Sequence, residues 1–350
     1  MAHGTFEVTD ADAHYLDHLA DLTPYMEEPW KSRIENNRNL LPSTTGDRTV
    51  YGRVQREDTD YHGYKTKPEE IPAIMDRLGF DNIVLLSQQM LTFPLIEADD
   101  ERMARIAGAY VEYLLDQVVD RNEGIYTMIP VPHKDIDAAV DLIEEFGDEK
   151  EIVGICFETA GGEPPLGNRR YDPIYELAQK KDLTVNFHAG GAGLNELQIS
   201  GFERLLETHT LGFLFHNMAV MTSILVQGVP VKFPDLQIAF QESGIGWVPM
   251  MMNRLDAGYL KRQSEAPLLE KRPSTYMKEF YYGTQPLEIP NEAELERTIE
   301  AIGGPERLLY ASDYPHWDYD GPEVITDLSF LSDEEKQMIL SDNAKEVFGI

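Results

Sequence analysis

The sequence predicts a (β/α)8 TIM barrel, on three observations. First, short apolar runs alternate with helix-like segments, and such alternation is typical of a parallel sheet with right-handed crossovers. Second, the alternation gives eight strands, and a chain of 350 residues suits one barrel domain spanning residues 1–350. Third, the competing open, doubly wound sheet usually has a Gly-rich phosphate loop after its first strand, whereas Ala-Asp-Ala-His follows Asp10 here.

The expected strands are short runs dominated by apolar residues, and most are followed by a polar residue or a turn. In chain order they cover residues 6–12, 82–87, 125–130, 152–157, 184–188, 236–242, 278–284 and 308–313.

The expected helices carry apolar residues at helical spacing, and the first is entered through Pro68. The segment over 201–228 is expected in two pieces, broken near Gly212. The last helix begins at Ser332, which has the spacing of a capping box with Glu335. In chain order the helices cover residues 68–80, 99–122, 134–146, 171–181, 201–228, 247–260, 291–302 and 332–348.

Residues 15–67 form a long polar segment between the first strand and the first helix. It is rich in Pro, Gly, Asn, Asp and Tyr and shows little sustained period. A loop of this length is uncommon inside a compact domain unless it covers a site. We therefore expect a lid-like β1–α1 insertion over one end of the barrel.

The formal net charge of −32 comes from 62 acidic against 30 basic residues. Such a field repels phosphate, so neither nucleic acid nor an anionic membrane is an expected partner. A small carboxylated substrate remains possible if a metal ion and arginines reverse the sign locally. Acid spread along the whole chain also fits a protein from a high-salt cytoplasm, although an ordinary acidic protein fits nearly as well.

Cys156 is the only cysteine, so no intrachain disulfide can form, and this usage suits a reducing cytoplasm. The N-terminus lacks the basic-then-apolar pattern of a signal peptide, and no apolar run reaches the length needed to cross a bilayer. We expect a soluble cytoplasmic protein.

The first strand ends in Asp10-Ala11-Asp12-Ala13-His14. Side chains two apart in a strand lie on the same face, so Asp10, Asp12 and His14 are expected to point the same way. This pattern suits a metal site, and the alternative is a polar strand end that is merely solvated.

Polar residues at other strand ends strengthen the metal interpretation. His188 ends the fifth strand, Asp313 ends the eighth, and Glu242 closes the sixth. The carboxyl ends of barrel strands surround one opening, so these side chains are expected to converge there with those of the first strand. The alternative for His188 is a core histidine bonded to backbone, but the turn Ala189-Gly190-Gly191 after it lets other groups approach closely and favours a ligand.

Imidazole and carboxylate donors together suit zinc or iron, and a high share of oxygen favours manganese or another harder ion. The four candidate ligands would leave at least one position for water or substrate. We expect one divalent ion, with zinc preferred and manganese or iron as alternatives. The candidate ligands are Asp12, His14, His188 and Asp313.

Taken together, these motifs resemble the amidohydrolase-2 group. They are Asp-x-Asp-x-His on the first strand, His188 on the fifth, Val231-Lys232-Phe233-Pro234-Asp235-Leu236 before the sixth, and Tyr310-Ala311-Ser312-Asp313-Tyr314-Pro315-His316-Trp317-Asp318 at the eighth. This branch of the amidohydrolase superfamily contains aminocarboxymuconate-semialdehyde decarboxylase and related nonoxidative decarboxylases.

The resemblance covers nearly the whole chain. It implies a barrel with one catalytic divalent metal ion, held by the four ligands given above. It also implies decarboxylation, hydration or hydrolysis of a small carboxylated substrate, often aromatic or unsaturated.

The chain departs from this pattern at two positions. Asp12 stands where the family commonly has His or Glu, and Glu242 or Ser243 stands where the decarboxylases have an acid-base histidine. The run from Gln241 to Pro249 instead looks like a subgroup with Glu-Ser-Gly-x-Gly-Trp at this point. Glu242 either moves a proton beside the metal or forms a salt bridge with Arg254 or another base.

Two further histidines have open roles. His216 lies near an expected helix start and either acts as an imidazole acid or base, or caps the helix or packs in the core. His316, three residues after Asp313, contacts substrate, orients a ligand, or only packs there.

Two arginines are candidates for holding the substrate carboxylate. Arg254 occupies a position where the related decarboxylases offer an arginine across a dimer interface, which would require a homodimer or a higher homo-oligomer. Arg53, on the expected lid, is the weaker candidate because lone loop arginines are usually solvated.

Three functions follow from these residues. The first is a metal-dependent lyase, in particular a nonoxidative decarboxylase. The second is a metal-dependent hydrolase of an amide, lactone or ester bond. The third is a noncatalytic binding barrel, which fold alone does not exclude but which the ligand residues at three strand ends disfavour.

Overall fold

Eight parallel strands form one sheet in the sequential order β1 to β8 in the computed structural model, which describes residues 6–17, 19–36, 67–95, 100–190 and 205–350. Sequential order with every neighbour parallel is the topology expected from strand–helix alternation. The strands are β1 (Thr9–Tyr15), β2 (Asn82–Ser87), β3 (Ile125–Pro130), β4 (Ile152–Glu158), β5 (Thr184–His188), β6 (Ile238–Gln241), β7 (Tyr281–Gly283) and β8 (Leu308–Leu309).

The sheet curls so that its last strand returns to its first. The backbone N–H of Ala11 donates to the carbonyl of Tyr310 at 2.9 Å, and that of Asp313 donates to the carbonyl of Asp12 at 2.8 Å. These bonds join β1 to the chain that follows β8, so the expected barrel is confirmed.

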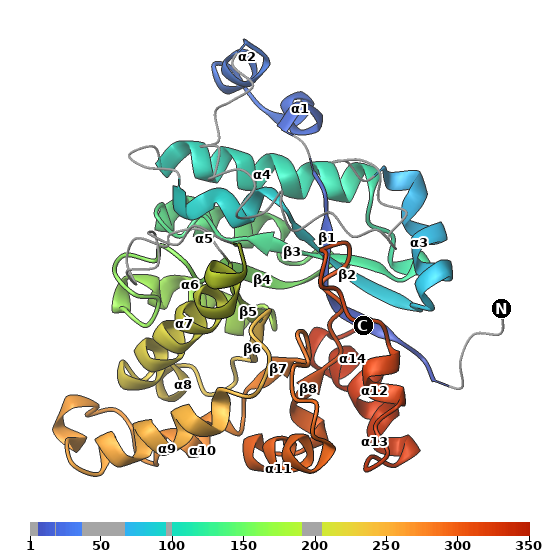
Figure 1. Ribbon diagram of the computed structural model, residues 1–350. Coiled ribbons are helices and arrows are strands. Elements are labelled where there is room, and N and C mark those ends of the chain that lie inside the picture. Colours follow the sequence, from blue (N-terminus) through green and yellow to red (C-terminus); the bar gives the residue numbers. More distant parts are fainter. Residues whose placement is uncertain (1–5, 18, 37–66, 96–99, 191–204) are drawn as a thin grey trace.

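Helices surround the sheet (Figure 1). They connect successive strands, as the alternation predicted. The longer ones are α3 (Ile71–Leu78), α4 (Asp100–Gln117), α5 (Ile136–Phe146), α6 (Asp172–Lys180), α7 (Leu205–Val226), α9 (Val248–Tyr259) and α11 (Glu292–Ile302). The shorter ones are α1 (Leu19–Leu22), α2 (Trp30–Asn36), α8 (Val229–Lys232), α10 (Pro273–Met277), α12 (Glu323–Thr326), α13 (Asp333–Gln337) and α14 (Asn343–Phe348).

Aromatic side chains show which way the middle strands face. Phe157, at the penultimate position of β4, packs on Tyr175 of α6 with ring centroids 5.9 Å apart, and it also contacts Phe187 of β5. These phenylalanines therefore point outward, towards the helices. Because side chains alternate along a strand, the next residues, Glu158 and His188, point into the barrel.

Two helical segments differ from the sequence expectation. α7 is continuous through Gly212, so the expected break is wrong; an interior glycine costs only about 1 kcal/mol, which tertiary packing of an apolar helix outweighs. The C-terminal helix is interrupted by a π-helical turn over Met338–Asp342, where the backbone carbonyl of Ile339 accepts from the N–H of Tyr310. Ser332 and Glu335 form the expected capping box at the start of α13.

The described part of the segment 15–67 contains short helices that pack on the outside of the barrel. Tyr25 donates from Oη to a carboxylate oxygen of Asp116 at 2.6 Å, and Trp30 donates to Glu101 at 3.3 Å, so this part contacts α4. Residues 37–66, with Arg53, lie outside the described residues. The lid remains a prediction.

Residues 209–226 of α7 are long and apolar enough, by length and composition alone, to cross a bilayer. No membrane-spanning segment was expected, because no uninterrupted apolar run in the sequence is long enough to cross a bilayer. Of this window, 44% is buried inside the molecule, and Met221, Ile224 and Leu225 are fully buried. A buried core helix passes the same test, so this finding is weak evidence for a membrane span.

Candidate active site

The polar strand ends converge on one buried cluster at the mouth of the barrel. Asp12 and His14 come from β1, His188 from β5, and Asp313 from the turn after β8. All four side chains are at most 2% exposed. The fold therefore brings together residues some 300 positions apart in the sequence, as expected.

The donor atoms within this cluster lie at distances that one ion can bridge. Asp12 Oδ1 is 3.4 Å from His188 Nε2 and 3.9 Å from His14 Nε2. His14 Nε2 is 3.1 Å from Asp313 Oδ1, and the rings of His14 and His188 have centroids 5.0 Å apart. Two overlapping sets have donors all within 4.8 Å: Asp12, His14 and His188; and His14, Asp313 and His316.

The chemistry of these donors fits a divalent cation. Both carboxylate oxygens of Asp12 and both ring nitrogens of His188 are buried and make no hydrogen bond to any residue that the structure describes. Buried polar atoms normally have partners, because leaving them unsatisfied is costly. Imidazole nitrogen and carboxylate oxygen are common ligands of zinc and related ions. The cluster is a divalent-metal site.

The charge balance around His188 agrees with this assignment. Burial by itself lowers the pKa of His188, but the carboxylates of Asp12 and Glu242 outweigh it, so that pKa lies well above its usual value. These carboxylates thus favour a positive charge at the position of the ring. A bound divalent cation supplies that charge while His188 ligates in its neutral form.

A bulge in β1 interrupts the regular alternation next to Asp10. The register with β2 shifts between Asp10 and Ala13, so simple alternation does not hold there. The Asp10 carboxylate accepts from the backbone N–H of Ser312 at 2.9 Å and also from the Ser312 hydroxyl. The Asp10 carboxylate thus ties β1 to the turn that carries Asp313, and it belongs to neither donor set.

Two residues at this mouth have left-handed backbone angles. Glu242 has φ of 53° and Asp313 has φ of 59°, in a region that L-residues other than glycine rarely adopt. Such residues persist where surrounding structure fixes them, and they concentrate at functional sites.

Glu242 lies next to the cluster. Its Oε2 is 3.4 Å from His188 Nε2, and its side chain is 2% exposed. Arg254, by contrast, is exposed on α9. The structure thus places Glu242 beside the candidate ligand His188, and the salt bridge to Arg254 remains only an alternative from sequence.

His316 is fully buried and bonded to Asp313. Its Nδ1 donates to Asp313 Oδ1 at 2.5 Å, and its Nε2 lies 3.2 Å from the amide oxygen of Gln88. This geometry supports the role of orienting a ligand more than contact with substrate. Its membership of a donor set also makes it a possible ligand itself.

His216, on α7, is a neutral imidazole next to the β5 end. Its Nδ1 donates to the carbonyl of Gly190 at 3.0 Å, and burial lowers its pKa. The other nitrogen, Nε2, is buried and has no hydrogen-bond partner among the described residues, so it offers a lone pair. The neighbouring Asn217 binds the carbonyl of Gln241 and the hydroxyl of Ser243, which holds α7 against the turn carrying Glu242.

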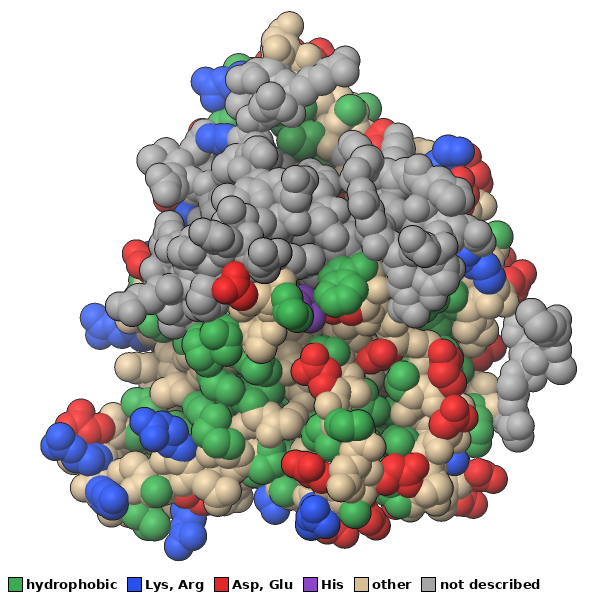
Figure 2. Space-filling model, viewed as in Figure 1, with side chains coloured by type: hydrophobic (Ala, Val, Ile, Leu, Met, Phe, Trp, Pro, Cys, Tyr) green, Lys and Arg blue, Asp and Glu red, His purple; other side chains and the backbone are tan. Residues whose placement is uncertain are grey.

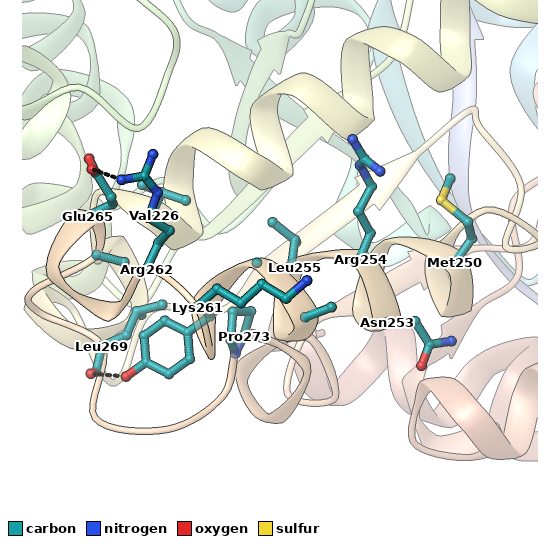
Figure 3. A pocket seen from close by; sticks show the side chains of 14 residues that line it. Val226, Met250, Asn253, Arg254, Leu255, Lys261, Arg262, Glu265, Leu269 and Pro273 are labelled. Carbon is teal, nitrogen blue, oxygen red and sulfur yellow. Dashed lines mark hydrogen bonds and ion pairs between the residues drawn. The ribbon is translucent and has the colours of Figure 1, made fainter.

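Arg254 is not part of the buried cluster. It lines a groove of about 760 Å³ between the end of α7, α9 and the turn before α10, where its guanidinium extends away from α9 (Figure 3). Lys261 and Arg262 line the same groove. Figure 2 shows Lys and Arg side chains gathered over α9 and α10 at the lower left, in a view where acidic side chains are spread over the lower right.

Sequence reasoning missed Glu158 and Gln88. Glu158 is the last residue of β4, 1% exposed, with Oε2 3.9 Å from His188 Nδ1. It stands at the end of an apolar strand, the same signal that identified His188. Gln88 follows β2 directly and carried no comparable signal, because a lone glutamine is not specific to any site.

Comparison with known proteins places the chain in a family. A family profile described as amidohydrolase matches residues 9–350. Among solved structures, an amidohydrolase from Mycobacterium avium subsp. paratuberculosis K-10 is 18% identical with a TM-score of 0.79, covering 99% of each chain.

Two similar structures are decarboxylases. A 5-carboxyvanillate decarboxylase from Novosphingobium aromaticivorans DSM 12444, complexed with manganese and 4-hydroxy-3-methoxy-5-nitrobenzoic acid, is 18% identical with a TM-score of 0.74, covering 99% of this chain and 97% of that one. A 2,6-dihydroxybenzoate decarboxylase from Rhizobium is 18% identical with a TM-score of 0.70, covering 97% and 99%. At this identity the structures show a shared fold, whereas the profile spans nearly the whole chain, and the protein therefore belongs to the amidohydrolase family.

Proposed function

We propose that this protein is a metal-dependent lyase that removes carbon dioxide from a small carboxylated, aromatic or unsaturated, substrate without an organic cofactor. The observation that carries the proposal is the fully buried cluster of Asp12, His14, His188 and Asp313. Family membership and the decarboxylases among the similar structures support it.

The ion is held by these four residues, and His316 orients Asp313. When bound, the ion acts as a Lewis acid towards a substrate oxygen. We propose zinc as the resident ion, with manganese or iron as alternatives, because the donors combine imidazole nitrogen with carboxylate oxygen.

Decarboxylation breaks the bond between the substrate carbon and its carboxylate. Carbon dioxide leaves, the bonding electrons stay on the carbon, and that carbon takes up one proton. Glu242 in its acid form supplies this proton, because its carboxyl group lies at the mouth beside His188. His216 is the second candidate, since its Nε2 can carry and release a proton while Nδ1 stays bonded to Gly190.

We also propose that the active form is a homodimer or higher homo-oligomer, in which Arg254 of one protomer binds the substrate carboxylate of its partner. Arg254 is exposed on α9 rather than buried in its own cluster. Three exposed apolar side chains lie on the same part of the chain: Met250 is 48% exposed, Leu260 54% and Leu268 45%. These side chains are available for contact with a second protomer. Arg53 is the alternative carboxylate ligand.

A hydrolase of an amide, lactone or ester bond is the second candidate function. Glu242 occupies a position beside a metal ligand from which a carboxylate can take a proton from an attacking water. A noncatalytic barrel is the third, and the intact buried donor set argues against it. We place the protein in the cytoplasm, since its one cysteine is buried and unpaired.

The test combines metal analysis with two substrate panels. Protein purified without chelator is expected to carry close to one divalent ion per chain and to release carbon dioxide from one or more aromatic or unsaturated acids. His188→Ala should lose the ion, and Glu242→Gln should keep the ion and lose turnover. Hydrolysis of a lactone or amide panel without carbon dioxide release would favour the hydrolase. Absence of stoichiometric metal in a folded protein would refute both enzyme proposals.

Subunit complementation tests the arginine. Arg254→Ala and Glu242→Gln homodimers should each be inactive, whereas mixing them should restore about a quarter of wild-type activity, because half of the dimers would then contain one intact site. Arg262→Ala, in the same groove, is the matched control and should stay active. No recovery on mixing, with dimers shown by light scattering, would contradict the proposal.

A further inference from the structure

We propose that Glu158 is a positioning residue of the metal centre: its carboxylate holds the Nδ1–H side of His188, so that Nε2 faces the ion, and Gly190 keeps open the space that this carboxylate needs. The inference rests on the proposed metal function. It assigns a role to a buried acid that the proposed chemistry does not use.

Strand register brings the two residues together. β4 and β5 run parallel with Glu158 directly opposite His188, so both side chains leave the sheet on the same face. The pairing is completed beyond the strand ends by the N–H of Thr159, which donates to the carbonyl of His188 at 3.0 Å. The backbone thus fixes the carboxylate beside the ring.

The two nitrogens of His188 face different groups. Nε2 is 3.4 Å from both Asp12 Oδ1 and Glu242 Oε2, on the side of the metal cluster. Nδ1 is 3.9 Å from Glu158 Oε2. That distance is slightly beyond a direct hydrogen bond, and a shift of about 1 Å or one bridging water completes it.

This arrangement decides which tautomer of His188 is favoured. A neutral imidazole carries one proton, and the nitrogen that binds a metal must be the other one. A carboxylate at Nδ1 stabilises the proton there and leaves the Nε2 lone pair for the ion. Metal-binding histidines commonly have such a carboxylate partner, and its loss typically weakens metal binding by about 10- to 100-fold.

Gly190 provides independent evidence that the position of the carboxylate matters. A Cβ at Gly190 would lie 2.2 Å from Glu158 Oε1 and 2.7 Å from its Cδ, closer than real Cβ atoms approach other atoms. The Glu158 carboxylate therefore occupies the space that a side chain at position 190 would need. The carbonyl of the same glycine accepts from His216, so one turn supports both a metal ligand and a candidate acid or base.

Four variants test the inference through metal affinity rather than turnover. They are Glu158→Ala, Glu158→Gln, Gly190→Ala and the double variant Glu158→Ala/Gly190→Ala, with Zn²⁺ affinity measured by competition with a chromophoric chelator. Glu158→Ala should bind Zn²⁺ about 10- to 100-fold more weakly than wild type. Glu158→Gln should lose less, because its amide oxygen still accepts a proton from Nδ1.

Gly190→Ala should also weaken Zn²⁺ binding, because the new methyl group displaces the Glu158 carboxylate. The same substitution should have little further effect in the Glu158→Ala background, where the space is empty. Such non-additivity is the signature of two residues that act through one contact. Thermal unfolding of each metal-free variant identifies any that does not fold.

Glu149→Gln is the matched control. Glu149 is an exposed acid that precedes β4. Its replacement removes one negative charge, as Glu158→Gln does, but leaves the surroundings of His188 unchanged. The Zn²⁺ affinity of this variant should therefore equal that of wild type. Wild-type affinity in Glu158→Ala would overturn the inference, as would equal losses in the Gln and Ala variants, which would indicate a charge effect without orientation. If wild type itself binds no divalent ion, the proposed function fails and the inference falls with it.

Discussion

Glu242 and Asp313 hold backbone angles that L-residues adopt at an energetic cost. For Glu242, with φ of 53°, this cost is on the order of 1 kcal/mol, and it disappears when the residue is glycine. A strained residue at the edge of the metal cluster is consistent with selection for the position of its side chain.

The first prediction is that, at position 242, the glycine variant is more stable than the alanine variant, which is the reverse of the order in a helix. Glu242→Gly is expected to be more stable than Glu242→Ala by about 1 kcal/mol, because glycine adopts positive φ without strain. At the exposed helical Glu296 in α11, the Ala variant should instead be more stable than the Gly variant by about the same amount. Urea unfolding measures both pairs. Alanine being the better residue at both positions would contradict the prediction.

A second prediction concerns His133, which is fully buried just after β3. Burial, with smaller contributions from Lys134 and Arg170, lowers its pKa from 6.5 to about 4. The unfolded chain therefore takes up a proton below about pH 6.5, while the folded protein does so only near pH 4. Stability linked to this group is full above pH 6.5 and is lost as the pH falls towards 4.

His133→Gln removes this contribution. Wild type should lose up to roughly 3 kcal/mol more unfolding free energy than the variant between pH 7 and pH 4. The measurement is the difference between the two proteins in urea unfolding along the pH series. Parallel curves would show that His133 does not titrate differently on folding.

At single positions, the sequence predicted which candidate ligands the fold brings together, but it did not predict how the neighbouring side chains are arranged. His188 and Asp313 could be found because each ends an apolar strand. The role of Asp10 could not, because its hydrogen-bond partner, Ser312, lies some 300 positions away in the sequence. Glu158 could have been found by continuing its strand one residue further.

At the scale of elements, the C-terminal segment shows what local signals determine. Ser332 accepts from the N–H of Glu335 at 3.2 Å, and Glu335 accepts from the N–H of Ser332 at 2.8 Å, as their spacing predicted. Nothing local indicated the π-helical turn over Met338–Asp342, since it depends on packing against β8 and β1.

This capping box gives the third prediction. Ser332→Ala should lower the unfolding free energy by about 1 kcal/mol. The substitution removes the hydroxyl that accepts from the N–H of Glu335 and so breaks the reciprocal pair of bonds at the start of α13. Ser264→Ala, at an exposed turn, is the control and should change it by less than about 0.5 kcal/mol. Equal effects in chemical denaturation would show that the cap contributes nothing to stability.

The bounds of some strands could be predicted from the sequence, and those of others could not. β5 has the predicted bounds because its apolar run is flanked by clear turns, whereas β8 keeps only Leu308 and Leu309 of the six residues expected. Beyond Leu309, the N–H of Tyr310 bonds to Ile339 in the C-terminal segment instead of to β7. Such competition between partners is tertiary and leaves no periodic signal.

At the scale of the whole molecule, the net charge of −32 dominates the electrostatics. Self-repulsion of this size destabilises the folded state, and salt reduces it by shortening the Debye length from about 10 Å at 0.1 M to about 3 Å at 1 M.

The fourth prediction is that the melting temperature rises between 0.1 M and 1 M KCl. The rise should be largest in the first part of this range, where screening changes most. Sucrose at matched osmolality serves as the control for effects that do not depend on charge. A melting temperature that is flat or falls with KCl would contradict the prediction.

The return of the last strand to the first also bears on biosynthesis. Asp12 and His14 are synthesised at the start of translation, but Asp313, and the backbone bonds that join its turn to β1, exist only after about 300 further residues have been added. A chain that stops before Tyr310 consequently lacks the carbonyl that closes the sheet onto Ala11, and it also lacks the proposed ligand Asp313. Closure of the sheet and assembly of the proposed metal site are therefore late events in the synthesis of this chain.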